Sequence, residues 1–424
     1  MPARSSKPLT PKASSAPRAP RARPNSFARS RTEAEMPVPH SPAPDWAALR
    51  AEFPATATTV YLDTARKALL PRCAGAAAQD WFADIASPEA GATAFAMGGV
   101  TRTRETVGRV FGAAPETIGL VRNTSEAMNI VATGLDWREG DNVVLSAAEH
   151  ENNTFPWRPL ARRGVELRIV PEGPDGVVST DALRAAVDAR TRVLTVAWLS
   201  YGTGQRADLD ALADIARAQD ALLVVDAIQA LGVIDRRLDA MGADVVAAGG
   251  HKAQLSVTGA GLMHLGPRAL ERITPPFAAK YSFDTLDRTV ADLHWAPGAR
   301  RFEYGNPNFL GLAIQRRSAE FVGSIGLSAI ETRVRDLTTL LIETLDLAHI
   351  PVRTPRLWSE RGGIVSLETG RVSADALEAA LAEDGIRVAS KDGHLRAAIH
   401  FYNNEEDVTR FADRLLHHLR RLTA

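Results

Sequence analysis

The sequence predicts an α/β protein in two parts: a large domain built on a mostly parallel β-sheet covered by helices, and a smaller C-terminal α+β domain. From residue 61 onward, short β-branched apolar runs alternate with amphipathic stretches. Strands that are apolar on both faces and alternate with helices are typical of a parallel sheet covered on both sides. After residue 311 the pattern changes to a long helical segment and a β-rich module. We therefore place the large domain at residues 37–310 and the linking helix with the small domain at residues 311–424.

The large domain is expected to contain strands joined mostly by helices. The clearest helix covers residues 208–218, where Leu209, Leu212 and Ile215 recur at helical spacing. The expected strands cover residues 59–63, 118–122, 142–146, 166–171, 192–200, 221–226, 245–249 and 261–265.

In the C-terminal part, a helical pattern runs from residue 311 to residue 347. Strands are expected at 364–368, 386–389 and 396–401, with a helix at 373–383 between the first two. A final helix is expected at 405–422, because its apolar residues form one stripe. That stripe contains Val408, Phe411, Leu415, Leu419 and Leu422.

The N-terminal segment differs from the rest of the chain. Residues 1–36 are rich in Pro, Ser, Ala and Arg without apolar periodicity, so they are predicted to be a disordered tail. Residues 1–32 hold eight basic residues and no acid, and since the chain has 50 basic and 50 acidic residues, the remainder carries −8. A mistaken start ahead of Met36, a nucleic-acid-binding or scaffold arm and a targeting peptide all remain open. The tail has no helix-turn-helix pattern, so a nucleic-acid partner is not expected.

Composition excludes several classes of protein. The longest apolar runs, residues 193–199 and 221–225, are far shorter than the roughly 20 residues that cross a bilayer, so no membrane span is expected. Cys73 is the only cysteine, which excludes an intrachain disulfide and a multi-cysteine metal site, and no metal is predicted. A chain of this kind fits a reducing compartment, so we expect a cytoplasmic protein.

Two candidate functional residues follow strands of the large domain. Lys252, in Ala-Gly-Gly-His-Lys, comes directly after the strand at 245–249, and Asp226 ends the preceding strand in Asp-Ala-Ile-Gln. The carboxyl ends of parallel strands are where such sheets bind ligands, and an acid shielded from water there needs a cationic partner. Gln229 can reach the same ligand from the same turn. Taken singly, Lys252 reads as a surface lysine, and Asp226 as either a ligand-binding residue or a helix cap.

Four further residues occupy comparable positions. Thr124 and Ser125 open a helix after a strand, where free N–H groups and the helix dipole make an anion site, or where either side chain simply acts as the N-cap. His150 follows the strand at 142–146 and can stack on a flat ring or serve as a structural hydrogen-bonding group. Arg396 opens a C-terminal strand, and its guanidinium suits a carboxylate, the alternative being a surface ion pair.

The order and spacing of these residues resemble those of the class V aminotransferase family of fold type I pyridoxal-phosphate enzymes. This family includes cysteine desulfurases, selenocysteine lyases and isopenicillin N epimerase. The likeness extends from Tyr-Leu-Asp-Thr-Ala at residues 61–65 to His-Leu-Arg-Ala-Ala-Ile-His-Phe-Tyr-Asn-Asn-Glu-Glu-Asp at residues 394–407. It implies the fold type I architecture, pyridoxal 5'-phosphate as the cofactor and an amino acid as the substrate.

The resemblance also implies a role for each candidate residue. Lys252 would form the internal Schiff base and shuttle the α-proton through a quinonoid intermediate, with the catalytic His150 stacked on the ring. Asp226 would keep the pyridine nitrogen protonated, so that the ring acts as an electron sink. Arg396 would hold the substrate carboxylate and Gln229 the ring oxygen. The phosphate would be bound by Thr124, Ser125 and His251.

Three positions depart from the family pattern. Gly249 stands where many relatives have the Ser of Ser-x-His-Lys, which removes one phosphate ligand. Asn306, in Phe-Glu-Tyr-Gly-Asn-Pro, replaces a Thr that reaches the neighbouring subunit's phosphate, and if Asn306 takes that role the enzyme is a homodimer. Desulfurases need a nucleophilic cysteine shortly before the counterpart of Arg396, whereas residues 389–394 contain none and Cys73 lies far away. A cysteine desulfurase that forms a persulfide is therefore disfavoured.

The leading prediction is a transaminase acting on an amino acid, with a C–S or C–Se lyase and an amino-acid epimerase as alternatives, because the family performs all three reactions.

A rival from another class is an NAD-dependent oxidoreductase. Gly-Thr-Gly-Gln-Arg-Ala at residues 202–207 follows a strand, and Asp226 comes about 20 residues later, as in a dinucleotide-binding fingerprint. That fingerprint normally opens the first unit of its domain, and several strands precede it here. A non-catalytic relative is disfavoured because Lys252 and Arg396 are both retained.

Overall fold

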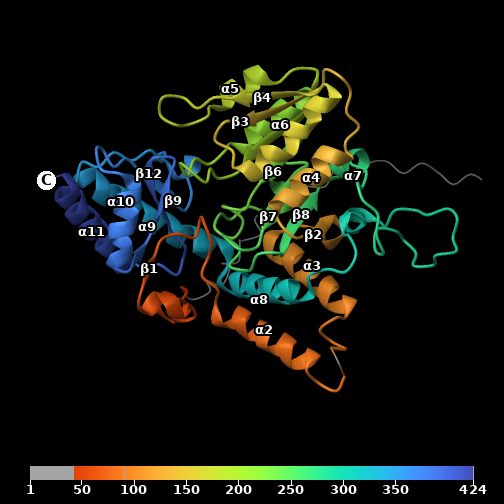
Figure 1. Ribbon diagram of the computed structural model, residues 1–424, viewed down its shortest axis with the longest axis horizontal. Coiled ribbons are helices and arrows are strands. Elements are labelled where there is room, and N and C mark those ends of the chain that lie inside the picture. Colours follow the sequence, from red (N-terminus) through yellow and green to blue (C-terminus); the bar gives the residue numbers. More distant parts are fainter. Residues whose placement is uncertain (1–42, 90, 424) are drawn as a thin grey trace, which may run out of the picture. The chain divides into compact units, whose positions relative to one another are not determined.

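A seven-stranded sheet is the centre of the computed structural model, which describes residues 43–89 and 91–423. Six of its seven strands run in one direction, and the seventh, β8, runs antiparallel to its two neighbours. Figure 1 shows this sheet with the helices around it. This arrangement confirms the predicted, mostly parallel sheet. In spatial order the strands are β2 (Ile118–Val121), β8 (Gly261–Leu265), β7 (Val245–Gly249), β6 (Leu222–Asp226), β5 (Thr191–Ala197), β3 (Asn142–Ser146) and β4 (Glu166–Val170).

Both faces of this sheet are covered, as the apolar character of its strands requires. In β6, Leu222 and Val224 pack into one apolar cluster, whereas Leu223 and Val225 pack into another. Helix α4 (Thr124–Gly134) contributes to the first cluster. The second cluster contains residues of α3 (Met97–Phe111), α6 (Leu209–Ala218) and α8 (Phe309–Ile325).

The C-terminal part contains two smaller sheets. One is antiparallel with the order β11 (Ala389–Lys391), β12 (His394–Ala398) and β9 (Ile364–Leu367). In the other, β1 (Val60–Tyr61) pairs in parallel with β10 (Ile386–Arg387). The strand expected at 59–63 therefore lies with the C-terminal part, because Val60 and Leu62 pack into its core. The strand expected at 386–389 is divided between the two sheets.

The long helix expected at 311–347 is two helices, α8 and α9 (Leu327–Leu347). Gly326 separates them with φ +90°, a conformation that glycine adopts readily and other residues resist. Contacts unite residues 43–424 in one compact unit, and the predicted boundary after residue 310 stays a prediction. The remaining α-helices are α1 (Trp46–Ala51), α2 (Arg72–Ile85), α5 (Thr180–Ala186), α7 (Pro267–Arg272), α10 (Ala374–Glu383) and α11 (Glu405–Thr423).

The predicted disordered tail, residues 1–36, lies outside the described residues. Across residues 43–89 and 91–423, no helix combines the length and apolar character needed to cross a membrane.

Candidate active site

Lys252 lies in a tight loop directly after β7. The Leu255 N–H donates to the Lys252 carbonyl (2.9 Å), and the Ser256 N–H donates to the Gly250 carbonyl (2.8 Å). Lys252 is only 8% exposed, so it is not a surface lysine. Burial lowers the pKa of its amine to about 8; Asp226 and Asp63 oppose this shift and Arg396 adds to it. Roughly a tenth of the amine is therefore uncharged at pH 7, far more than for an ordinary lysine, and this is the form that attacks a carbonyl.

Asp226 ends β6, the strand beside β7, and is 4% exposed. Its Oδ1 accepts a hydrogen bond from the Ile228 N–H at 3.0 Å. Burial raises the pKa of this carboxyl to about 6, against the opposing effects of the Ile228 N–H and Lys252. No Lys, Arg or His of the described chain forms an ion pair with it. A buried carboxyl in this situation is well suited to a cationic ligand group.

Arg396, on β12, is buried and is not the surface ion pair that the sequence also allowed. It is 5% exposed. Its Nη1 donates to the Tyr201 carbonyl at 2.9 Å and its Nη2 donates to Asp63 Oδ1 at 3.2 Å. Burial lowers the pKa of the guanidinium, and Asp63 opposes that effect. The Nε–H is buried and has no hydrogen-bond partner within the described residues, so the protein itself leaves one donor of the guanidinium unused.

His150 follows β3 and caps the 3-10 helix η3 (Glu151–Asn153). Its Nδ1 accepts a hydrogen bond from the Asn152 N–H at 3.2 Å. Its ring meets the Tyr201 ring edge-on, with 5.0 Å between the centroids. Burial, and then the charge of Lys252, lowers the pKa of the imidazole. A neutral ring therefore lies beside the Lys252 site while it also makes the structural hydrogen bond.

Glu149 is a buried acid to which the sequence analysis gave no role. Its Oε1 accepts from the Ala197 N–H at the end of β5 (2.8 Å), and its Oε2 accepts from Asn153 Nδ2 (2.7 Å). Burial raises the pKa of this carboxyl to about 8, and nearby Asp226 adds to the shift. Glu149 thus ties the turn that carries His150 to the strand beside Asp226. The available sequence signal was an acid at the end of a fully buried strand.

The N-terminus of α4 contacts the Lys252 loop through Thr124, whose Oγ1 accepts a hydrogen bond from the Gly249 N–H at 3.2 Å. The N-cap of α4 is Asn123, whose side chain accepts from the Glu126 N–H at 2.9 Å. The expectation that Thr124 or Ser125 caps the helix is therefore wrong. The Asn123 amide already reaches the third helical N–H, which leaves the Thr124 hydroxyl for β7.

Gly249, which stands where relatives have a serine, is closely packed. A Cβ at Gly249 would lie 3.1 Å from Ile228 Cδ1 and 3.3 Å from His251 Nδ1, so a larger residue requires movement of its neighbours.

Burial, and then the charge of Lys252, lowers the pKa of His251 to about 4. Around this loop the imidazole is therefore neutral near neutral pH and can donate a hydrogen bond without carrying charge.

Residues 63–65, which the sequence analysis used only for the family likeness, contact two candidate site residues. Asp63 pairs with Arg396, and the Ala65 carbonyl accepts a hydrogen bond from Gln229 Nε2 at 3.0 Å. Asp63 also forms an isolated β-bridge with Ala398, the last residue of the strand that carries Arg396. No local sequence pattern predicts the contact between Asp63 and Arg396, because 333 residues separate them.

Two singled-out residues lie away from this cluster. Asn306 is exposed and lines a separate cavity of about 350 Å³ together with Arg122 and Tyr304. Lys252, Asp226 and Arg396 are not among the residues that line that cavity. Cys73 lies at the start of α2, where burial raises the pKa of its thiol.

The predicted dinucleotide fingerprint has a structural explanation instead. A Cβ at Gly204, where φ is +75°, would lie 2.2 Å from the Ile364 carbonyl oxygen, so this glycine permits a close backbone approach within the chain. Gln205 forms two hydrogen bonds with the Val178 backbone, at 3.1 and 2.8 Å. The carboxylate of Asp208 caps α6 by accepting from the Ala211 N–H at 3.1 Å, which places negative charge where a pyrophosphate would bind.

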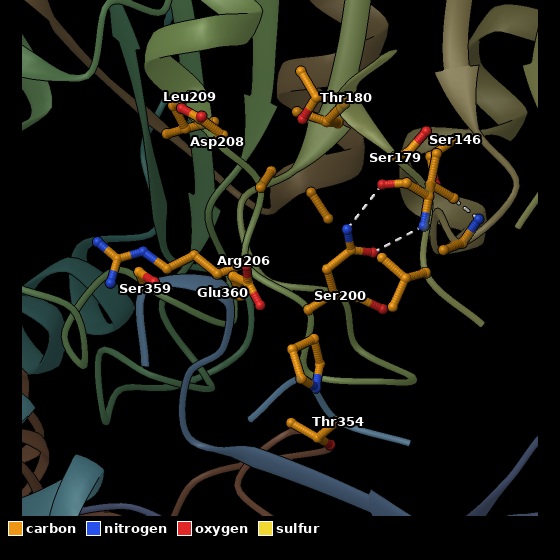
Figure 2. A pocket seen from close by; sticks show the side chains of 18 of the residues that line it. Ser146, Ser179, Thr180, Ser200, Arg206, Asp208, Leu209, Thr354, Ser359 and Glu360 are labelled. Carbon is orange, nitrogen blue, oxygen red and sulfur yellow. Dashed lines mark hydrogen bonds between the residues drawn. The ribbon is translucent and has the colours of Figure 1, made fainter. Parts of the chain in front are cut away.

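This fingerprint loop lines a cavity of about 1110 Å³. Figure 2 shows Ser200, Arg206 and Asp208 around it, opposite Thr354 of the C-terminal part. Because the chain itself uses Gly204, Gln205 and Asp208, the loop does not support an NAD-dependent oxidoreductase.

The fold and the Lys252 cluster together define a pyridoxal-phosphate enzyme of fold type I. The residues present fit that cofactor, with a buried amine of lowered pKa for its aldehyde and a buried carboxyl for its ring nitrogen. The family model for aminotransferase class V matches residues 60–411. The chain belongs to this family, as the sequence resemblance predicted, and pyridoxal 5'-phosphate is its cofactor.

The relatives that match most of the chain include cysteine desulfurases. The probable cysteine desulfurase of Methanothermobacter thermautotrophicus is 29% identical over 387 residues, covering 85% of this chain and 94% of the relative. The solved apo cysteine desulfurase of Thermococcus onnurineus NA1 has a TM-score of 0.81 at 25% identity, covering 92% of this chain and all of that one. The cystine C–S lyase C-DES, solved with its product cysteine persulfide, shares the fold with a TM-score of 0.78 at 22% identity, covering 86% and 99%.

These relatives correct the functional prediction. The argument against a cysteine desulfurase was wrong, because it rested only on the missing cysteine at residues 389–394, whereas proteins named as cysteine desulfurases match most of the chain. A C–S bond can also be broken by elimination after loss of the α-proton, a route that the cofactor promotes and that needs no protein thiol. The comparisons also favour the lyase alternative over the leading transaminase prediction.

Proposed function

We propose that the protein is a pyridoxal-phosphate-dependent C–S lyase of the cysteine desulfurase type, which removes the sulfur of L-cysteine or a closely related sulfur amino acid. The supporting observation is the buried Lys252 amine, with a pKa near 8, beside Asp226 and Arg396. The choice among the family's reactions rests on the relatives of the chain, because a reactive lysine is common to all of these reactions.

Under this proposal each residue has one task. Arg396 binds the substrate carboxylate through donors that include its free Nε–H, and Asp63 holds the guanidinium in place. Asp226 bonds the ring nitrogen, Gln229 the ring oxygen, and His150 lies against the ring. The phosphate is bound by Thr124, Ser125 and His251.

The bound cofactor supplies an electron sink for the negative charge that develops at the substrate's α-carbon. The Lys252 amine bonds the cofactor aldehyde in the resting enzyme and then carries the substrate's α-proton. Its lowered pKa suits both tasks, because an uncharged amine can attack and accept a proton near neutral pH. The buried setting also excludes water that would compete for this proton.

We also propose a homodimer in which Asn306 contacts the cofactor phosphate of the neighbouring subunit. Its exposed position, away from the Lys252 cluster of its own chain, supports this role. A cytoplasmic location completes the proposal, because the chain has a single cysteine and no disulfide.

The test is to incubate the purified holoenzyme with L-cysteine, L-cystine and non-sulfur amino acids, with a thiol present. We expect sulfide from the sulfur amino acids, with alanine or with pyruvate and ammonia as the organic product. Keto acid formed only when a second keto acid is supplied, without sulfide, would restore the transaminase, and an inverted enantiomer would indicate an epimerase.

A further inference from the structure

His400 is a fully buried imidazole that none of the roles above uses. It is 0% exposed and follows β12, four residues after Arg396. Its ring stacks on that of Tyr402, with 5.5 Å between centroids and 9° between planes. A polar ring in such a position needs hydrogen bonds at both nitrogens.

Two hydrogen bonds determine which nitrogen of His400 carries the proton. The Phe401 N–H donates to Nδ1 at 2.9 Å, so Nδ1 is unprotonated. Nε2 lies 3.1 Å from the Ala253 carbonyl oxygen, and because a carbonyl only accepts, Nε2 carries the proton. Burial lowers the pKa of the ring to about 4, which keeps this neutral form throughout the neutral range.

The acceptor of this hydrogen bond belongs to the backbone of the lysine loop. Ala253 follows Lys252 directly, and its carbonyl is also approached closely by Gly232. A Cβ at Gly232, where φ is +114°, would lie 2.4 Å from the same oxygen. The carbonyl is therefore held between the Gly232 backbone and the His400 ring, with little freedom to move.

We propose that His400 is a positioning residue that sets the place of the Lys252 amine relative to Arg396 by donating its Nε2–H to the Ala253 carbonyl. One short segment thus carries the group that binds the substrate carboxylate and the group that holds the lysine loop. This inference rests on the proposed roles of Lys252 and Arg396.

The test compares His400→Asn with His400→Gln in the holoenzyme. The Asn oxygen can replace Nδ1 but leaves the Ala253 carbonyl without a donor, whereas the Gln amide can replace the Nε2 donor. A displaced amine lowers the rate of proton transfer more than it weakens carboxylate binding, so kcat for sulfide release from L-cysteine is expected to fall about tenfold to 100-fold in His400→Asn with KM nearly unchanged. The kcat of His400→Gln is expected to stay within about threefold of the wild-type value. Only His400→Asn should shift the pH midpoint of the visible absorption band.

The proposal is overturned if both variants lose kcat equally while the absorption midpoint stays that of the wild type, since that pattern reflects a purely structural role. It is also overturned if His400→Asn matches the wild type. If the Asn variant does not fold, Gly232→Ala displaces the same carbonyl from the other side and must show the same loss of kcat and the same shift. A wild-type protein without Lys252-dependent visible absorption would instead refute the proposed function itself.

Discussion

The loop after β7 and the loop after β5 open at the same edge of the sheet, and both carry sequence motifs of cofactor sites. In the first, Lys252 is buried beside Asp226, which ends the neighbouring strand β6 and has no ion-pair partner among the described residues. Arg396, which is also buried, keeps an unpartnered Nε–H. In the second, Gly204 meets the Ile364 backbone, and Gln205 and Asp208 bond the protein's own backbone. A motif indicates a ligand site when its polar groups are left for the ligand, and a structural turn when the chain uses them itself.

The largest effect is expected from Lys252→Ala, which removes the group that bonds the cofactor aldehyde and carries the α-proton. We expect kcat for sulfide release to fall about 10³-fold, a usual loss for a proton-transfer group. Gln205→Ala, in the other loop, is the matched control and should keep kcat. A comparable loss of kcat in both variants would contradict the view that only the loop after β7 belongs to the active site.

The second effect concerns Arg396→Ala. Loss of a charge-assisted contact with the substrate should raise KM for L-cysteine about tenfold to 100-fold, while the cofactor stays bound and the visible absorption is retained. Arg396→Lys, the control, keeps the charge but not the planar guanidinium. Its KM should lie between the values of the wild type and Arg396→Ala. An unchanged KM in Arg396→Ala would mean that the carboxylate binds elsewhere.

Glu149 lines the same cavity as the loop after β5 and also lies near Asp226, so it adjoins both regions. Burial raises its pKa from 4.5 to about 8, so the folded protein keeps a proton that the unfolded chain loses above pH 4.5. Its stabilising contribution is complete below pH 4.5 and is lost as the pH rises through 8.

Glu149→Gln should abolish this dependence. Denaturant titration of the apo protein should show the wild type losing up to about 4 kcal/mol more unfolding free energy between pH 5 and pH 8 than the variant. Asp226, whose pKa rises to about 6, contributes the same trend to both proteins. Parallel profiles for the two proteins would show that Glu149 is already ionised at pH 5.

The smallest effect is expected from Asp208→Ala, which removes the cap of α6. Loss of an N-cap lowers the unfolding free energy by about 1 kcal/mol, and kcat should not change. Isothermal titration with NAD should detect no binding in the wild type or the variant. NAD binding that strengthens when the Asp208 charge is removed would reopen the oxidoreductase alternative.

Local patterns predicted the strands of the sheet, because each strand depends on neighbours in sequence, whereas the roles of the candidate residues stay predictions. Strands β3, β7 and β8 have the predicted bounds. The pairing of β1 with β10 was not predictable, since an isolated two-residue strand carries no information about a partner over 300 residues away. Asp63 was missed for the same reason. Glu149 was visible in the sequence, but its burial depends on Ala197 of another strand.

The central claim is that the buried amine of Lys252 bonds the cofactor, and borohydride reduction of the holoenzyme tests it most directly. Reduction should bleach the visible band, and peptide mass spectrometry should find the pyridoxyl group on Lys252 alone. A label on another lysine, or a holoenzyme that carries no reducible cofactor, would contradict the claim.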